Sequence, residues 1–198
     1  MKNSMLGLLV LAAAVLAGCA HPMSIKPDLA TLAASPVSQD QRIQKNVGLF
    51  IAPADRAKLV TSKGGGGDKV TYAPYADTET GLYKVLGDAF LGVAIVQGPN
   101  DTETITKKQL AYILQPDITT VSSSSGVFTW MATDFSVTIA CKVTDPAGQP
   151  VTTVSATGTG KATSDEVMKN FNLAGERASQ DALMKLRTAL TQSAELKK

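Results

Sequence analysis

The side chains most often used in catalysis and metal binding are scarce in this sequence. It contains one histidine, His21, and two cysteines, Cys19 and Cys141. Ser/His/Asp catalysis requires a histidine base that is held by the fold, whereas His21 lies in a segment that we expect to be flexible. A zinc site of His and Cys needs more such ligands than are present. The acidic residues show no glycosidase or metal-ligand spacing, so we expect no enzymatic activity, no metal and no cofactor.

Cys141 lies in a stretch that alternates apolar and polar residues. It shares its parity with Val137, Ile139 and Val143, which places all four side chains on one face of a strand. No histidine or cationic cluster lies nearby in the sequence to lower the pKa of its thiol. We therefore interpret Cys141 as a core residue, with a reactive thiol as the alternative.

Residues 1–18 have the three-part composition of a secretory signal. Lys2 supplies a positive charge, the stretch from Met5 to Ala17 is uncharged and mostly apolar, and Ala17 and Gly18 are small. The apolar run has about 13 residues, whereas a membrane-spanning helix needs roughly 20. No later run is as long, so we expect the mature chain to have no transmembrane helix.

Leu16, Ala17, Gly18 and Cys19 resemble the lipobox of bacterial lipoproteins at every position. The resemblance implies that a diacylglyceryl group is attached to the sulfur of Cys19, that the signal is cleaved before Cys19 and that the new amino group is acylated. Each buried methylene contributes about 0.8 kcal/mol, so several chains hold a protein where one holds it only marginally. Ala20 stands where Asp would imply retention in the inner membrane, which implies export to the outer membrane. A plain signal peptide, or a disulfide to the other cysteine, is the alternative.

The charge of the chain argues against nucleic acid as a partner. Residues 1–18 contain one charged side chain, Lys2, so 18 of the 19 basic residues remain against 17 acidic ones. A nucleic-acid-binding domain would show a basic stripe, and electrostatic attraction to anionic lipid is likewise not expected to be the main membrane contact. The chain is 44% hydrophobic, which is enough for a core, and about 180 residues after the signal suit one domain with a tether.

We divide the chain into a signal peptide (1–18), a lipidated flexible tether (19–44), a globular domain (45–192) and a polar C-terminal tail (193–198). The tether contains three prolines after Cys19 and many Ser, Thr and Gln residues without periodicity. As a flexible coil it would span on the order of 28 Å. We therefore expect the tether to hold the domain away from the membrane.

The domain is predicted to be α+β, with a mainly antiparallel sheet and two helices packed on one of its faces. Residues 47–51 form a nearly continuous apolar run, which is typical of a central strand. The four glycines at 64–67 are not followed by the Gly-Lys-Ser/Thr of a phosphate loop, so we interpret them as a hairpin tip. Further strands are predicted near 58–61, 70–72, 93–96, 110–118, 127–143 and 151–162.

Two helices are predicted from apolar residues that recur three and four positions apart. The first covers residues 77–90, with Asp77 or Thr78 as its N-cap. The second begins at a capping box formed by Thr163 and Glu166. Small side chains on its buried stripe would let it lie close to the sheet. The stripe consists of Phe171, Ala174, Ala178, Ala182, Leu186 and Leu190.

Phe128 and Trp130 are the predicted contact with a partner protein. They lie on the opposite parity from the expected core, beside the serine-rich residues 122–125. Exposed aromatic residues contribute much of the energy of protein interfaces. A β-bulge that returns both rings to the core is the alternative.

From Lys108 onward the order of the predicted elements and their residue patterns resemble the small α+β domains of outer-membrane lipoproteins of the YajG and CsgG kinds. The resemblance rests on a strand like 111–115 and a final helix like 165–190. It implies a non-enzymatic assembly or adaptor role and transfers no binding residue. We therefore expect a lipid-anchored, periplasm-facing outer-membrane lipoprotein that binds another envelope protein. The alternative is a carrier or chaperone that shelters a lipid or other amphiphile between sheet and helices.

Overall fold

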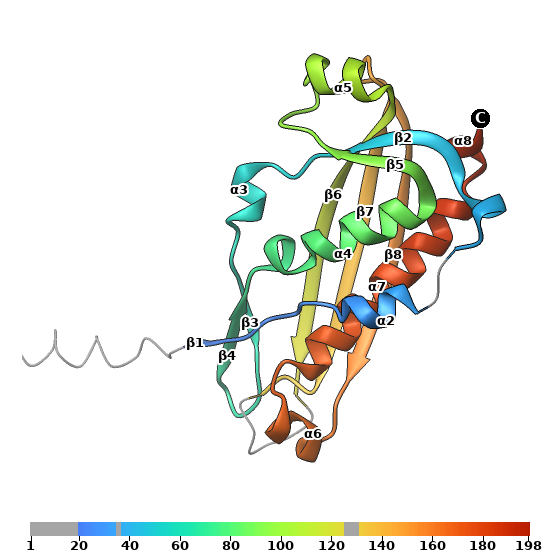
Figure 1. Cartoon of the computed structure of the whole chain (residues 1–198). Coiled ribbons are helices and arrows are strands. Elements are labelled where there is room, and N and C mark those ends of the chain that lie inside the picture. Colours follow the sequence, from blue (N-terminus) through green and yellow to red (C-terminus); the bar gives the residue numbers. More distant parts are fainter. Residues whose placement is uncertain (1–19, 35–36, 125–130) are drawn as a thin grey trace, which may run out of the picture.

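The computed structural model describes residues 20–34, 37–124 and 131–198 (Figure 1). Within these residues the strands form a five-stranded sheet and a three-stranded sheet, so the predicted α+β fold class is confirmed. The strands are β1 (Ala20–Pro22), β2 (Ile43–Leu49), β3 (Val60–Lys63), β4 (Lys69–Tyr72), β5 (Phe90–Ile95), β6 (Leu110–Ser123), β7 (Asp134–Thr144) and β8 (Pro150–Lys161). The helices are α2 (Leu29–Ala33), η1 (Gln39–Gln41), α3 (Pro53–Arg56), α4 (Pro74–Ala89), α5 (Thr102–Lys108), α6 (Ser164–Lys169), α7 (Leu173–Gln192) and α8 (Ala194–Lys197).

The larger sheet has the strand order β5-β2-β6-β7-β8. Strand β2 is central, as its apolar sequence predicts, and it runs parallel to both β5 and β6. Strands β6, β7 and β8 form an antiparallel meander, as predicted. The parallel pairs were not predicted, because parallel pairing depends on crossover connections and the crossover helix α5 was missed. The Asp101 side chain caps this short helix by accepting the N–H of Thr104 at 3.1 Å.

Both long helices, α4 and α7, lie on the same face of the larger sheet (Figure 1), as predicted. Helix α7 covers β7 and β8, and α4 packs against α7 and against β5. Five of their leucines are fully buried in the main core: Leu82, Leu86, Leu183, Leu186 and Leu190. On the opposite side of β2, a smaller cluster of Val96, Ile105, Leu110 and Ile113 packs under α5. Both faces of the sheet are therefore covered at β2, whereas only the helix-facing side of β7 and β8 is covered.

The boundaries of the helices differ from those predicted. Helix α4 begins at Pro74, which occupies the first turn, where a missing N–H costs nothing. Asp77 is therefore not the cap but an acidic residue of the first turn. The capping box of Thr163 and Glu166 is confirmed, but it starts the separate short helix α6. Between α6 and α7 the chain leaves the helical path, and Phe171, predicted to be buried, is 42% exposed.

The close approach of α7 to the sheet is confirmed. Ala174, Ala178 and Ala182 are fully buried on the predicted stripe. Opposite them, β8 carries Gly158 and Gly160, and a methyl group built at either glycine would overlap the backbone of α7. Helix and strand are therefore in backbone contact, which leaves no space between α7 and β8 for the amphiphile of the alternative carrier function.

The prediction of a flexible tether over residues 19–44 is wrong for the residues that the structure describes. Strand β1 pairs in parallel with β4. The N–H of Ile25 donates to the buried carboxylate of Asp77 at 2.8 Å, and the side chains of Ile25 and Leu32 are fully buried. These apolar residues are isolated among polar ones, so their sequence shows no periodicity. Only the α4–α7 surface provides the sites that they fill, including the space beside Gly81 and Gly175.

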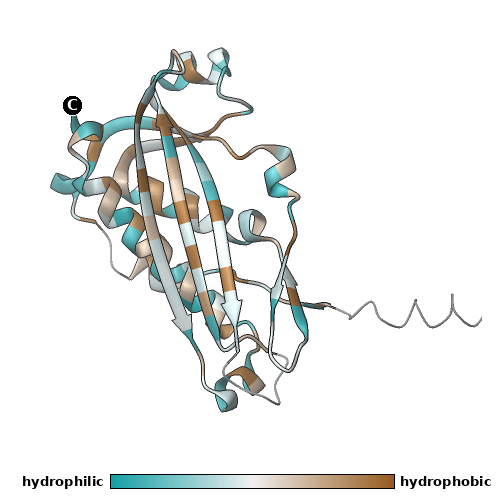
Figure 2. Ribbon diagram, turned by 180° about the vertical axis from the view of Figure 1, so that it is seen from behind, coloured by the Kyte–Doolittle hydropathy of each residue, from teal (hydrophilic) through white to brown (hydrophobic). Residues whose placement is uncertain are grey.

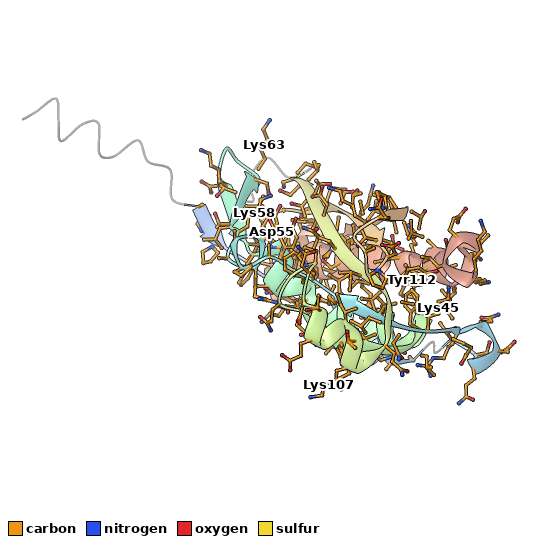
Figure 3. The ribbon with its side chains drawn as sticks, turned by 90° about the horizontal axis from the view of Figure 1, so that it is seen from above. Lys45, Asp55, Lys58, Lys63, Lys107 and Tyr112 are labelled. Atoms are coloured by element: carbon orange, nitrogen blue, oxygen red, sulfur yellow. The ribbon has the colours of Figure 1, made fainter. Side chains whose placement is uncertain are left out.

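The C-terminal residues 193–198 were predicted to be a polar tail, and this prediction is also wrong. They include α8, whose Leu196 is fully buried. Lys45 and Tyr112 lie side by side in Figure 3, with Lys45 Nζ 2.7 Å from the hydroxyl of Tyr112. That hydroxyl in turn donates to the carbonyl of Glu195 at 3.5 Å. One buried side chain is enough to dock a four-residue helix, and the sequence offers no periodic signal for it.

Candidate interaction surfaces

Three residues with predicted roles, Cys19, Phe128 and Trp130, lie outside the described residues. Their roles in lipid attachment and partner contact therefore stay predictions. The neighbour of Cys19 is nevertheless informative, because Ala20 is the first residue of β1. A lipid on Cys19 would be attached next to β1. We call this part of the domain, where Figure 1 shows β1 beside the β3–β4 hairpin, the β1 end.

The β1 end is a firmly attached part of the domain. The glycine-rich run is the tip of the β3–β4 hairpin, as predicted. Gly66 and Gly67 have φ values of 64° and 89°, a region that favours glycine. The hydroxyl of Tyr72 shares hydrogen bonds with Thr120 at 2.6 Å and Ser62 at 3.2 Å. These bonds connect the three-stranded sheet to β6. Strand β1 is therefore connected through β4 to the larger sheet.

Cys141 is a core residue, which confirms that interpretation. Its side chain has no exposed surface, and burial raises the pKa of its thiol to about 12. A reactive cysteine requires a thiolate near neutral pH. Cys141 therefore has the properties of a packing residue and not of a nucleophile.

The most varied group of polar side chains surrounds Tyr75, whose ring is buried. Its hydroxyl accepts the N–H of Ile118 at 3.2 Å, and Lys58 Nζ lies 5.9 Å from the centre of the ring. Asp55 and Lys58 are neighbours in Figure 3. Burial chiefly, with the negative charges of Asp55 and Asp117, raises the pKa of Tyr75. The phenol therefore stays protonated and serves as a hydrogen-bonding group of the core.

The face of the larger sheet that α4 and α7 leave open is seen from the front in Figure 2, and its strands carry threonine side chains there. Thr119, Thr138 and Thr157 lie directly opposite one another on β6, β7 and β8. The hydroxyls of Thr138 and Thr157 are 2.8 Å apart. This polar face agrees with the period-two pattern of the sequence.

Among the described residues, no group of three or more His, Cys, Asp or Glu side chains could hold a metal ion. In the same part of the chain, no helix has the length and hydropathy needed to cross a membrane.

The comparisons with known proteins give remote similarities. No family model matches the sequence, and no curated protein is significantly similar to it. A DUF330 protein from Xanthomonas campestris has a TM-score of 0.47 and 14% identity, over 86% of this chain and 92% of that chain. A minor lipoprotein from Acinetobacter baumannii has a TM-score of 0.39 and 12% identity, over 75% and 94%. The PelC dodecamer from Paraburkholderia phytofirmans has a TM-score of 0.41 and 13% identity, over 79% and 93%. At these values none of the three supports a functional assignment.

Proposed function

We propose that the protein is a bacterial lipoprotein that is anchored in the outer membrane by lipid on Cys19. It faces the periplasm and acts by binding another protein of the cell envelope. It works without catalysing a reaction and without a metal or cofactor. The proposal is carried by one observation, the lipobox at residues 16–19, whose cysteine directly precedes the first strand of the domain.

The position of β1 also suggests how the domain is oriented relative to the bilayer. Ala20 pairs with Lys69 of β4, and the Met23 N–H donates to the Thr71 carbonyl at 2.9 Å. Because this segment is held in the fold, acyl chains on Cys19 keep the β1 end close to the bilayer. The larger sheet and its open face then project into the periplasm, where a partner protein can reach them.

The lipid anchor is tested with two cysteine variants of the full-length protein in its native host. Cys19→Ser removes the acceptor sulfur, so we expect an unprocessed precursor that lacks the mass of the acyl chains. Cys141→Ala is the matched control and should keep the lipidated mass and the membrane location of the parent. An unchanged mass and membrane fraction for Cys19→Ser would refute lipid attachment.

The predicted aromatic contact is tested separately. If Phe128 and Trp130 bind a partner, Trp130→Ala should leave the melting temperature unchanged and weaken the recovery of crosslinked partner from intact cells, because interface aromatics contribute much of the binding energy. A large fall in melting temperature would instead assign Trp130 to the core.

A further inference from the structure

The two edges of the larger sheet are β8 and β5, and side chains of α7 cover the β8 edge at residues 157–161. Arg177, Asp181 and Lys185 lie on successive turns of the helix and reach the backbone groups of β8 that point away from β7. Exposed edges are commonly blocked in this way, because free N–H and C=O groups would pair with another strand. The three contacts are Arg177 Nη1 to the Lys161 carbonyl (2.6 Å), the Thr159 N–H to Asp181 Oδ2 (2.9 Å) and Lys185 Nζ to the Thr157 carbonyl (3.3 Å).

The β5 edge is built differently. Among the described residues, β5 has β2 as its only neighbouring strand. The Val96 N–H donates to the Leu49 carbonyl at 3.1 Å. Backbone groups alternate in direction along a strand, so the N–H and C=O groups of Leu91, Val93 and Ile95 point away from β2. The Tyr83 hydroxyl donates to the Val93 carbonyl at 3.3 Å, and that oxygen keeps a second lone pair.

The side chains along this edge carry no charge. Strand β5 has the sequence FLGVAI, and Leu91 and Ile95 are 54% and 41% exposed. Above the edge, α4 presents Tyr83, which is 45% exposed. Lysine, proline or a bulge would normally protect such an edge from pairing. Here the apolar side chains of Leu91 and Ile95 are exposed, and β5 itself contains neither lysine nor proline.

We propose that β5 binds an extended, uncharged segment of another envelope protein, which pairs with it as a sixth strand of the larger sheet. The outward backbone groups select an extended backbone, because they lie at every second residue. Leu91 and Ile95 select apolar side chains at matching alternate positions. This inference deepens the proposed protein-binding function by naming the contact surface and the chemistry of the partner.

The geometry argues against a second copy of the chain as the occupant. Head-to-tail pairing would need the β8 edge, and Arg177, Asp181 and Lys185 already bond its outward backbone groups over residues 157–161. Antiparallel pairing of two β5 strands would relate the two molecules by a two-fold axis perpendicular to the joined sheet. The two β1 ends would then lie at opposite ends of that sheet, so both anchors could not hold their β1 ends against one bilayer. This second argument rests on the proposed lipid anchor.

The test is photocrosslinking of the full-length protein in its native host, with p-benzoylphenylalanine at Leu91 or at Ile95. The matched control is Val121, which is 69% exposed on the open face of β6. We expect Leu91 and Ile95 to crosslink to one uncharged segment of a partner, at positions about four residues apart, because paired strands advance together. We expect no such adduct from Val121.

Three outcomes would overturn the proposal. They are equal crosslinking from Val121, adducts of Leu91 only with a second copy of the chain, and adducts scattered over unrelated partner segments. As a second measurement, Ile95→Lys should lower the yield of the Leu91 adduct by about tenfold or more, because a charge at the edge opposes pairing, whereas Val121→Lys should not. Membrane fractionation of the same samples reports on the lipid anchor independently, so failure of the anchor and failure of the edge contact are distinguishable.

Discussion

The contact between α7 and β8 predicts that Gly158→Ala destabilises the protein. A Cβ atom at Gly158 would overlap the backbone nitrogen of Ala182 and the carbonyl oxygen of Ala178, and would lie 2.7 Å from the Cα of Ala182. Carbon atoms normally approach to about 3.5–4.0 Å, so α7 must move by roughly 1 Å. Because the obstructing atoms belong to the helix backbone, no side-chain rotation relieves the overlap, and Ala182→Gly should not rescue the variant.

The expected magnitude follows from two opposing effects. Overpacking of a core contact costs about 1–3 kcal/mol, and a backbone obstacle places this site at the upper end of the range. Replacing glycine by alanine also restricts the unfolded chain, which returns about 0.4–1 kcal/mol. We therefore expect a net loss of about 2 kcal/mol. For a protein of this size, 1 kcal/mol corresponds to about 2–4 °C, so the melting temperature should fall by about 4–8 °C.

The assay is thermal and urea unfolding followed by circular dichroism, on the chain from Ala20 onward, which contains every described element. Gly87→Ala in α4 is the matched control, because a Cβ there would meet nothing within 4 Å. This control should stabilise the protein by about 0.5–1 kcal/mol, the difference between alanine and glycine within a helix. An unchanged or raised melting temperature for Gly158→Ala would refute the backbone contact between α7 and β8.

Three other predictions test the packing of the N-terminal segment, the α6 cap and the core. Ile25→Ala should cost about 2–4 kcal/mol because it leaves a cavity, whereas Leu29→Ala, at an exposed position of the same segment, should change urea stability by less than about 0.5 kcal/mol. The hydrogen bond from Arg177 chiefly, with the Thr163 N–H, lowers the pKa of Glu166 from 4.5 to about 2. The stability from its ionised form is therefore present above pH 4.5 and lost as the pH falls toward about 2, so Glu166→Gln should reduce the acid dependence seen in urea titrations over that range. Cys141 should resist iodoacetamide in the folded chain from Ala20 onward and react after unfolding in urea, and labelling of the folded protein would contradict its burial.

The elements with strong periodicity could be predicted from the sequence. The meander β6–β8 follows from the alternation of apolar and polar residues, and Cys141 was placed on its core face for that reason. The alanine stripe of α7 indicated a close approach to the sheet, although the glycines of β8 that permit it were not recognised as partners. The capping box of Thr163 and Glu166 was correct because capping depends on residues only three apart.

The candidate surfaces were less predictable. The predicted lipobox rests on four consecutive residues, whereas the edge position of β5 is a property of the whole sheet. The strand that we predicted near residues 93–96 contains Ile95, whereas Leu91 lies before it. Their exposure depends on the position of β5 at the edge, which the crossovers through α4 and α5 decide.

The sequence by itself determined the local features of this protein: the strand alternation, the helix stripe and the scarcity of catalytic side chains. These features depend on residues close together along the chain. The signal with its cysteine stays a prediction. Only the tertiary structure decided that residues 20–34 pack on the domain, that α7 covers residues 157–161 of β8 and that β5 is an edge strand. Each of these depends on contacts between residues far apart in the sequence, such as Ile25 with Asp77, and isolated apolar or charged side chains show no pattern until the fold brings them together.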